Sequence, residues 1–136
     1  MNWFLFLAVY LLQIGVTIGP FYRSCESLDM ERWLIYFGHH VLDVVLVWSF
    51  LFLTEPIEFL LHFILAIGVA IHWMTNNNEC VLTVYMNSLC GYPADQWLDS
   101  LKNMLGLRAL SEYFLFYWLG ALLVQDVYVI WNFLLK

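Results

Sequence analysis

Three histidines and an aspartate lie within stretches of the chain that are otherwise apolar. His39 and Asp43 are four residues apart, so they share a face if their stretch is helical, and His40 stands beside them. His72 lies near the end of the next apolar stretch, which antiparallel pairing would bring to the same membrane face. Imidazole and carboxylate groups are suitable ligands for transition metals, and histidine can carry protons. His39, His40, Asp43 and His72 are therefore a candidate metal, haem or quinone site.

The same polar groups could instead bond to one another and hold helices together. Adjacent histidines on a helix point about 100° apart and do not easily share one ion. No HExxH spacing is present, and Gln13 reaches a comparable level on the first apolar stretch. We favour this packing interpretation, so we predict no catalytic residue and expect no cofactor.

A second polar set lies toward the opposite face of the predicted bundle. Glu58 and His62 are one helical turn apart, and Asp126 in the last apolar stretch falls at roughly the depth of His62. We predict an intramembrane pair between His62 and Asp126. Two polar clusters at different depths could also be stations of a proton or cation path, which leaves a small channel as a further hypothesis.

The composition indicates a chain that resides in lipid. Of its 136 residues, 63% are hydrophobic and 12% are charged, and the mean hydropathy is +0.77. Soluble domains average about 45 to 50% apolar and roughly 25% charged residues. The net charge of −6, from 11 acidic and 5 basic residues, argues against nucleic-acid binding, which needs clustered Lys and Arg. We expect a single transmembrane domain.

Four apolar stretches are long enough to cross a bilayer as helices, and this predicts an all-α, integral membrane four-helix bundle. The first is expected to stop at Pro20, and a cleaved signal peptide is its competing interpretation. Four crossings place both chain ends on one side of the membrane. The predicted spans are residues 3–19, 33–54, 57–75 and 113–135.

The segment 76–112 is the only substantial piece expected outside the membrane. Its apolar residues recur at helical spacing between Pro93 and Gly106, which suit the start and the end of a helix. We predict an interfacial amphipathic helix over residues 93–105, which lies on lipid or packs on another protein. Its lipid-facing or interface residues are Trp97, Leu98, Leu101, Met104 and Leu105.

The positive-inside rule predicts which side the longer loops face. They carry Arg23, Arg32, Lys102 and Arg108, whereas the opposite side has only Lys136. This bias places the loops in the cytoplasm and both chain ends outside. All three cysteines lie in these loops, so they are expected to be reduced thiols; a bond between Cys80 and Cys90 is the alternative.

The middle third of the chain resembles two groups of small membrane proteins. Leu61-His62, followed by CVLT at 80–83 and Asn87, is similar to a bacterial membrane family of unknown function with an LH pair and a CPLT-like signature, although Val81 replaces the proline. The block HWMTNNNECVLT at 72–83 resembles short polytopic membrane proteins of large DNA viruses. The viral likeness implies a location in an internal virion membrane or a host endomembrane, with capsid or membrane proteins as partners.

These observations predict a multi-pass membrane protein with a structural or assembly role, which could form homo-oligomers. The alternative is a redox protein that binds metal, haem or quinone through the intramembrane His/Asp cluster. No Gly-rich phosphate loop, GxSxG or DxD-type carboxylate pair is present, so hydrolase and transferase chemistry lacks its usual sequence signals.

Overall fold

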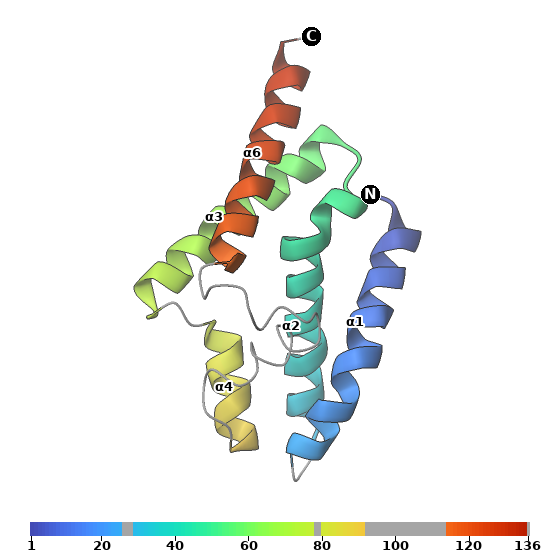
Figure 1. The fold of residues 1–136 in the computed structure, drawn as a ribbon, viewed down its shortest axis with the longest axis vertical. Coiled ribbons are helices and arrows are strands. Elements are labelled where there is room, and N and C mark those ends of the chain that lie inside the picture. Colours follow the sequence, from blue (N-terminus) through green and yellow to red (C-terminus); the bar gives the residue numbers. More distant parts are fainter. Residues whose placement is uncertain (26–28, 78–79, 92–113, 136) are drawn as a thin grey trace.

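The chain is built from helices throughout the part that the structure describes, and the expected all-α class is confirmed there. This computed structural model describes residues 1–25, 29–77, 80–91 and 114–135, and no strand occurs among them. The elements are α1 (Trp3–Ser24), α2 (Met30–Trp48), the 3₁₀ turn η1 (Ser49–Leu51), α3 (Pro56–Thr75), α4 (Val81–Cys90) and α6 (Phe114–Leu134) (Figure 1).

The helices form two antiparallel pairs, α1 with α2 and α3 with α6 (Figure 1). The short helix α4 lies beside the first half of α2, opposite the side that α1 covers. The start of α1 and the end of α6 lie at the same end of the molecule (Figure 1). This arrangement brings residues from α1, α2 and α4 together in the half of the molecule that is far from the chain ends.

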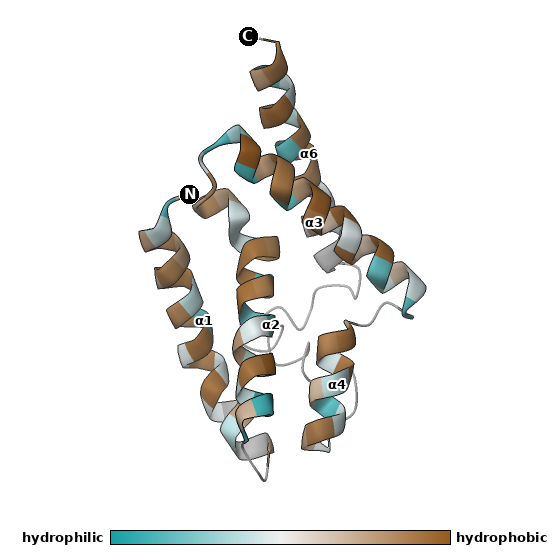
Figure 2. Cartoon of the chain, turned by 180° about the vertical axis from the view of Figure 1, so that it is seen from behind, coloured by the Kyte–Doolittle hydropathy of each residue, from teal (hydrophilic) through white to brown (hydrophobic). Residues whose placement is uncertain are grey.

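Three helical segments are long and apolar enough to cross a membrane: Met30–Leu51, Pro56–Thr75 and Tyr117–Leu134. The apolar stretch Trp3–Gly19 of α1 is shorter than these, so a bundle with four crossings remains a prediction. Figure 2 shows apolar residues along the outer sides of the helices. Exposed apolar surface of this extent is typical of helices that face lipid.

Pro20 does not end the first helix, contrary to the sequence prediction, because α1 continues to Ser24. The reason lies in the packing of the next residue. Phe21 is buried and stacks on Tyr36 of α2, with ring centroids 4.3 Å apart. Proline removes one backbone hydrogen bond, a loss that helices in lipid tolerate when neighbouring helices hold the turn in place.

The second helix begins earlier and ends earlier than the predicted span 33–54. Asp29 caps its start, because the side-chain Oδ1 accepts a hydrogen bond of 2.9 Å from the backbone N–H of Arg32. After Trp48 the chain tightens into η1, where the N–H groups of Phe52 and Leu53 both bond to the carbonyl of Ser49. α3 and α6 lie within one residue of the predicted spans 57–75 and 113–135.

The helix α4 was not predicted, because residues 76–112 were expected to form a loop with a single later helix. Its ten residues, Val81–Cys90, end at Gly91, which adopts the left-handed conformation that glycine tolerates best. The predicted surface helix 93–105, with Trp97, Leu98, Leu101, Met104 and Leu105, lies outside the described residues.

Two buried apolar clusters hold the helices in place. One joins α1, α2 and α4 through Phe21, Cys25, Tyr36 and Met86. The other joins α2, α3 and α6 through Leu46, Ala66 and Leu119. The indole N–H of Trp118 also donates a 2.9 Å hydrogen bond to the carbonyl of Val47, which links α6 to α2.

Candidate functional site

A buried polar network fills the space between α1, α2 and α4. Its first part is the hydroxyl of Thr17, which lies 2.7 Å from the hydroxyl of Tyr36 and 2.6 Å from Nε2 of His40. Nδ1 of His40 lies 3.0 Å from the carbonyl oxygen of Tyr36, so this nitrogen donates. All three side chains are buried. Both ring nitrogens of His40 are thus engaged by protein groups.

The second part of the network centres on His39, which connects all three helices. Its Nδ1 lies 3.4 Å from Oδ2 of Asp43, and its Nε2 lies 3.2 Å from the hydroxyl of Thr83 on α4. The amide of Gln13 on α1 donates to the same oxygen of Asp43 at 3.4 Å. The two nitrogens of one ring therefore serve different neighbours, a carboxylate on its own helix and the start of α4.

Cys80 completes this part of the network, and sequence reasoning did not find it. The residue precedes α4 as its N-cap, is 8% exposed and lies beside the ring of His39. Burial raises the pKa of the Cys80 thiol, but the neighbouring His39 ring and the backbone at the start of α4 outweigh burial and lower the pKa to about 7.

Cys80 can be identified from the sequence as part of this network only if the helix α4 that follows it is also predicted. In the sequence, Cys80 stands in a segment that was expected to be a loop, and its only apparent partner was Cys90. Asn76, where α3 ends, and the apolar residues after Cys80 are the signal that a new helix starts there. A cysteine at a helix N-terminus has a stabilised thiolate because unpaired N–H groups point toward it.

The four predicted metal-site residues do not all gather at one point. His39, His40 and Asp43 each offer a ligand atom, and these atoms lie within 4.8 Å of one another. His72 has a different role, because its Nε2 accepts a 3.2 Å hydrogen bond from the backbone N–H of Val81 at the start of α4. An ion at the first three residues would have to displace a hydrogen bond of His40, which makes packing the better account of the geometry.

His62 and Asp126 form a separate buried pair between α3 and α6. Nδ1 of His62 lies 2.6 Å from Oδ2 of Asp126, and each residue is 2% exposed. Nε2 of His62 has no hydrogen-bond partner among the described residues. Glu58 does not join this pair but bonds to the amino group of Met1 and to the backbone N–H of Thr54.

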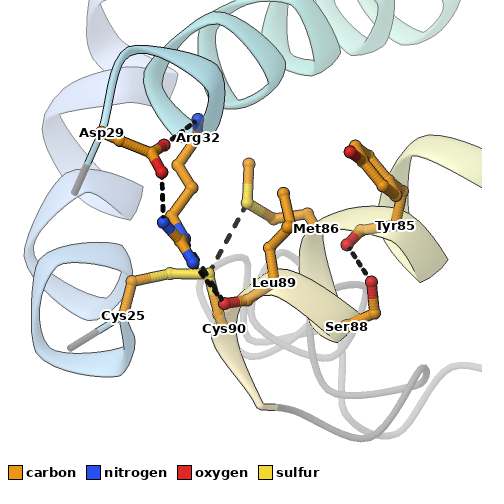
Figure 3. The surroundings of a disulfide bond; sticks show 8 residues. All are labelled: Cys25, Asp29, Arg32, Tyr85, Met86, Ser88, Leu89 and Cys90. Atoms are coloured by element: carbon orange, nitrogen blue, oxygen red, sulfur yellow. Dashed lines mark hydrogen bonds and ion pairs between the residues drawn. A yellow bond between two sulfur atoms is a disulfide. The ribbon is translucent and has the colours of Figure 1, made fainter. Parts of the chain in front are cut away.

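A disulfide joins Cys25 at the end of α1 to Cys90 at the end of α4 (Figure 3). The expectation that all three cysteines are reduced is therefore wrong for these two, and the alternative Cys80–Cys90 bond is wrong as well. Sequence position could not reveal the pair, because 65 residues separate the two cysteines. Cys80 is the free cysteine.

Arg32 reinforces the position of α4 next to the disulfide. Its guanidinium lies 2.6 Å from the carboxylate of Asp29 and donates two hydrogen bonds, of 3.0 and 3.3 Å, to the carbonyl of Leu89 (Figure 3). That carbonyl lies in the last turn of α4, where backbone acceptors are not satisfied within the helix. The disulfide and Arg32 together anchor the end of α4 to α1 and α2.

The arrangement can do two things chemically. It can lock three helices together through bonded polar groups, and it places one buried thiol, Cys80, beside an imidazole that is bonded to Asp43 and Thr83. No protein-family model matches the chain, and neither a curated protein nor a solved structure matches it significantly.

Proposed function

We propose that this chain is a polytopic integral membrane protein with a structural or assembly role. The observation that carries the proposal is the large apolar surface that the fold leaves uncovered. In the candidate spans within α3 and α6, only 17% of the residues are buried. Lipid covers such a surface in a monomer, and other membrane proteins or further copies of this chain cover it in an assembly.

The buried polar groups are hydrogen-bonded to one another, which supports a structural role rather than a catalytic one. Thr17, Tyr36 and His40 bond to one another, and His62 bonds to Asp126. Hydrogen bonds of this kind between membrane helices contribute about 0.6 to 2 kcal/mol each. They fix which helices pair and in what register, as an assembly unit requires.

In the proposed arrangement, α1, α2, α3 and α6 cross the bilayer and α4 does not. α1 is 22 residues long, and its antiparallel partner α2 belongs to a segment long enough to span. α4 has ten residues, or about 15 Å, which is half of the thickness of a hydrocarbon core. The predicted surface helix 93–105 then offers the interface to lipid or to a capsid or membrane protein.

The disulfide supports an orientation opposite to the one that the basic residues indicate. Disulfides form and persist in oxidising compartments, so we place Cys25 and Cys90 on that side and both chain ends in the cytoplasm. The charge bias depends on only five basic residues in the whole chain. A covalent bond between distant cysteines is the stronger indicator.

The location in a viral or virus-modified membrane rests on the resemblance of residues 72–83 to short proteins of large DNA viruses. Its test is quantitative mass spectrometry of purified virions and of membranes from infected cells. Enrichment with virion membrane proteins supports the location. A distribution that follows host membranes alone contradicts it and leaves the membrane assignment intact.

The membrane and assembly roles are tested on the full chain expressed in cells. After alkaline carbonate extraction the protein should stay in the membrane pellet, and photo-crosslinking from Ile64 on the outer side of α3 should trap a protein partner or a second copy. Recovery as a monodisperse, detergent-free species would overturn the membrane assignment. A stoichiometric metal or chromophore that is lost in His39→Ala would replace the assembly role with a redox function.

A further inference from the structure

We propose that Gln13, His39 and Asp43 form a binding site for a divalent cation of the zinc class, which joins α1 to α2. The site differs from the four-residue cluster predicted from the sequence, because it leaves out His40 and His72 and includes Gln13. It goes beyond the assembly role and does not depend on it.

The first argument is a polar atom that helix packing leaves without a partner. Gln13 is 4% exposed, and its Oε1 has no hydrogen-bond partner among the described residues. A buried amide oxygen without a partner costs free energy. The nitrogen of the same amide lies 3.4 Å from Oδ2 of Asp43. A half turn of the amide exchanges its oxygen and nitrogen, so the oxygen can face the carboxylate across a cation.

The second argument is the spacing of the three side chains. Oδ2 of Asp43 lies 3.4 Å from Nδ1 of His39 and 3.4 Å from Nε2 of Gln13. Both distances are longer than the range of about 2.7 to 3.2 Å for N–H···O hydrogen bonds. Two ligands at about 2.0 to 2.1 Å from a tetrahedral zinc ion lie about 3.3 to 3.4 Å apart. The observed spacing therefore matches the edges of a coordination shell.

The pair of His62 and Asp126 shows the distance at which the same two groups bond directly. Its Nδ1–Oδ2 distance is 2.6 Å, compared with 3.4 Å between His39 and Asp43. Asp43 lies within the membrane-length segment Met30–Leu51, where an ionised carboxylate is costly unless a charge partner neutralises it. A divalent cation between Asp43 and its two neighbours supplies that charge.

The third argument is the orientation of His39. Its Nε2 lies 3.2 Å from the hydroxyl of Thr83, so Nε2–H can donate there while Nδ1 binds an ion, as the outer-shell partners of metal-bound histidines require. Ligands four residues apart on a helix can bind one zinc ion, as the paired histidines of helical zinc sites do. His40 keeps its bonds to Thr17 and Tyr36 in this arrangement.

The site is open to exchange with solution on the side of Asp43. The side chain of Asp43 is 23% exposed, whereas that of His39 is 5% exposed. Three protein ligands leave a fourth tetrahedral position for water or for a group of another molecule. Zinc has no redox chemistry and is loaded from solution here, so it is distinct from a resident metal or chromophore that would indicate a redox function.

The experiment uses the full chain, purified in detergent without a polyhistidine tag and freed of metal with a chelator that is then removed. The probe is Zn²⁺, titrated in competition with a fluorescent zinc indicator. We expect one Zn²⁺ per chain, with nitrogen and oxygen ligands at about 2.0 to 2.1 Å in X-ray absorption at the zinc edge. A sulfur ligand at about 2.3 Å would place the ion at a cysteine and overturn the proposal.

Matched variants separate coordination from folding. Asp43→Asn and His39→Gln should each weaken zinc binding roughly 100-fold, since even the loss of an outer-shell partner costs about 10-fold to 100-fold. Gln13→Leu should weaken binding roughly 10-fold. The controls His62→Gln, in the separate buried pair, and Gln125→Leu, on α6, should bind zinc as the wild type does.

Folding of each variant is checked by size-exclusion chromatography and by an intact Cys25–Cys90 bond. The absence of stoichiometric zinc binding in folded wild-type protein overturns the proposal, as does equal affinity in wild type and Asp43→Asn. Either result leaves the membrane assignment and the assembly role intact, because those are tested by membrane extraction and crosslinking.

Discussion

Nε2 of His39 on α2 lies 3.2 Å from the hydroxyl of Thr83 in the first turn of α4. The contact forms where α4 packs on the first half of α2, and it leaves the ring beside Cys80, the residue that precedes α4. This relationship converts a cysteine with no apparent partner in the sequence into part of a buried network. It also sets the pH at which the thiol ionises.

Alkylation of Cys80 should follow a titration with a midpoint near pH 7. Cys80 lies outside the three candidate spans, and its pKa falls from 9.0 to about 7. The titratable groups that face it are His39 and Asp43 on α2, with His72 on α3 against the neighbouring Val81. The rate of modification by iodoacetamide, measured from pH 5 to 10 on native protein, gives the midpoint.

The same protein unfolded in denaturant should show a midpoint about two pH units higher, near the ordinary value of a thiol. Because the folded pKa is depressed, this group stabilises the fold fully above pH 9, and the contribution is lost as the pH falls through 7. A native midpoint equal to the unfolded one contradicts the geometry at Cys80.

The disulfide should be visible by counting thiols. Under denaturing conditions without reductant, a PEG-maleimide should attach one PEG group per chain, at Cys80. After reduction it should attach three. Cys80→Ser is the control: it should carry no PEG group before reduction and two after reduction. Two or three additions before reduction would contradict the Cys25–Cys90 bond.

Removal of that disulfide should destabilise the protein. A cross-link between residues this far apart contributes about 2 to 4 kcal/mol, chiefly by restricting the unfolded chain. Cys25→Ser/Cys90→Ser should therefore lower the unfolding midpoint in a detergent titration and free the end of α4. Met86, which packs in the same cluster, should then become more reactive to oxidants. An unchanged midpoint would contradict a stabilising role for the bond.

The contributions of His62 and Asp126 to the unfolding free energy should depend on each other. Asp126→Leu leaves the buried nitrogen of His62 without its partner and should cost about 1 to 3 kcal/mol of unfolding free energy. His62→Leu/Asp126→Leu removes both polar groups and should cost less than the sum of the two single changes. Unfolding in mixed micelles measures all four proteins of this cycle. Additive losses would show that the two residues do not interact.

Thr17→Val should weaken the contact between α1 and α2. The change keeps the shape of the side chain but removes the hydroxyl that bonds to both Tyr36 and His40. We expect a loss of about 1 to 2 kcal/mol in the same micelle assay. Thr75→Val is the matched control, because Thr75 is exposed and bonds only to carbonyls of its own helix, and it should change stability by less than about 0.5 kcal/mol. Equal effects of the two changes would contradict a role of Thr17 in helix pairing.

The sequence by itself determined the helical class and three of the membrane-length segments, since these follow from local hydropathy. It also determined where helices α3 and α6 begin and end, within one residue, since Pro56, the asparagines after Thr75 and the run of apolar residues act over a few positions. The matched depths of His62 and Asp126 could be predicted because antiparallel helices advance at the same rise per residue. Each of these properties depends on near neighbours in the chain.

Apart from His62 and Asp126, only the tertiary structure decided the partners that come from distant segments. The local rule for Pro20 failed because Phe21 packs on Tyr36, and the rule for loop cysteines failed because Cys25 and Cys90 meet at the end of the molecule. His39 contacts Thr83 rather than His72, and this contact likewise depends on the docking of α4 against α2. Hydropathy is a sum over single residues, whereas a hydrogen bond or a disulfide requires two groups in one place, and packing alone brings them there.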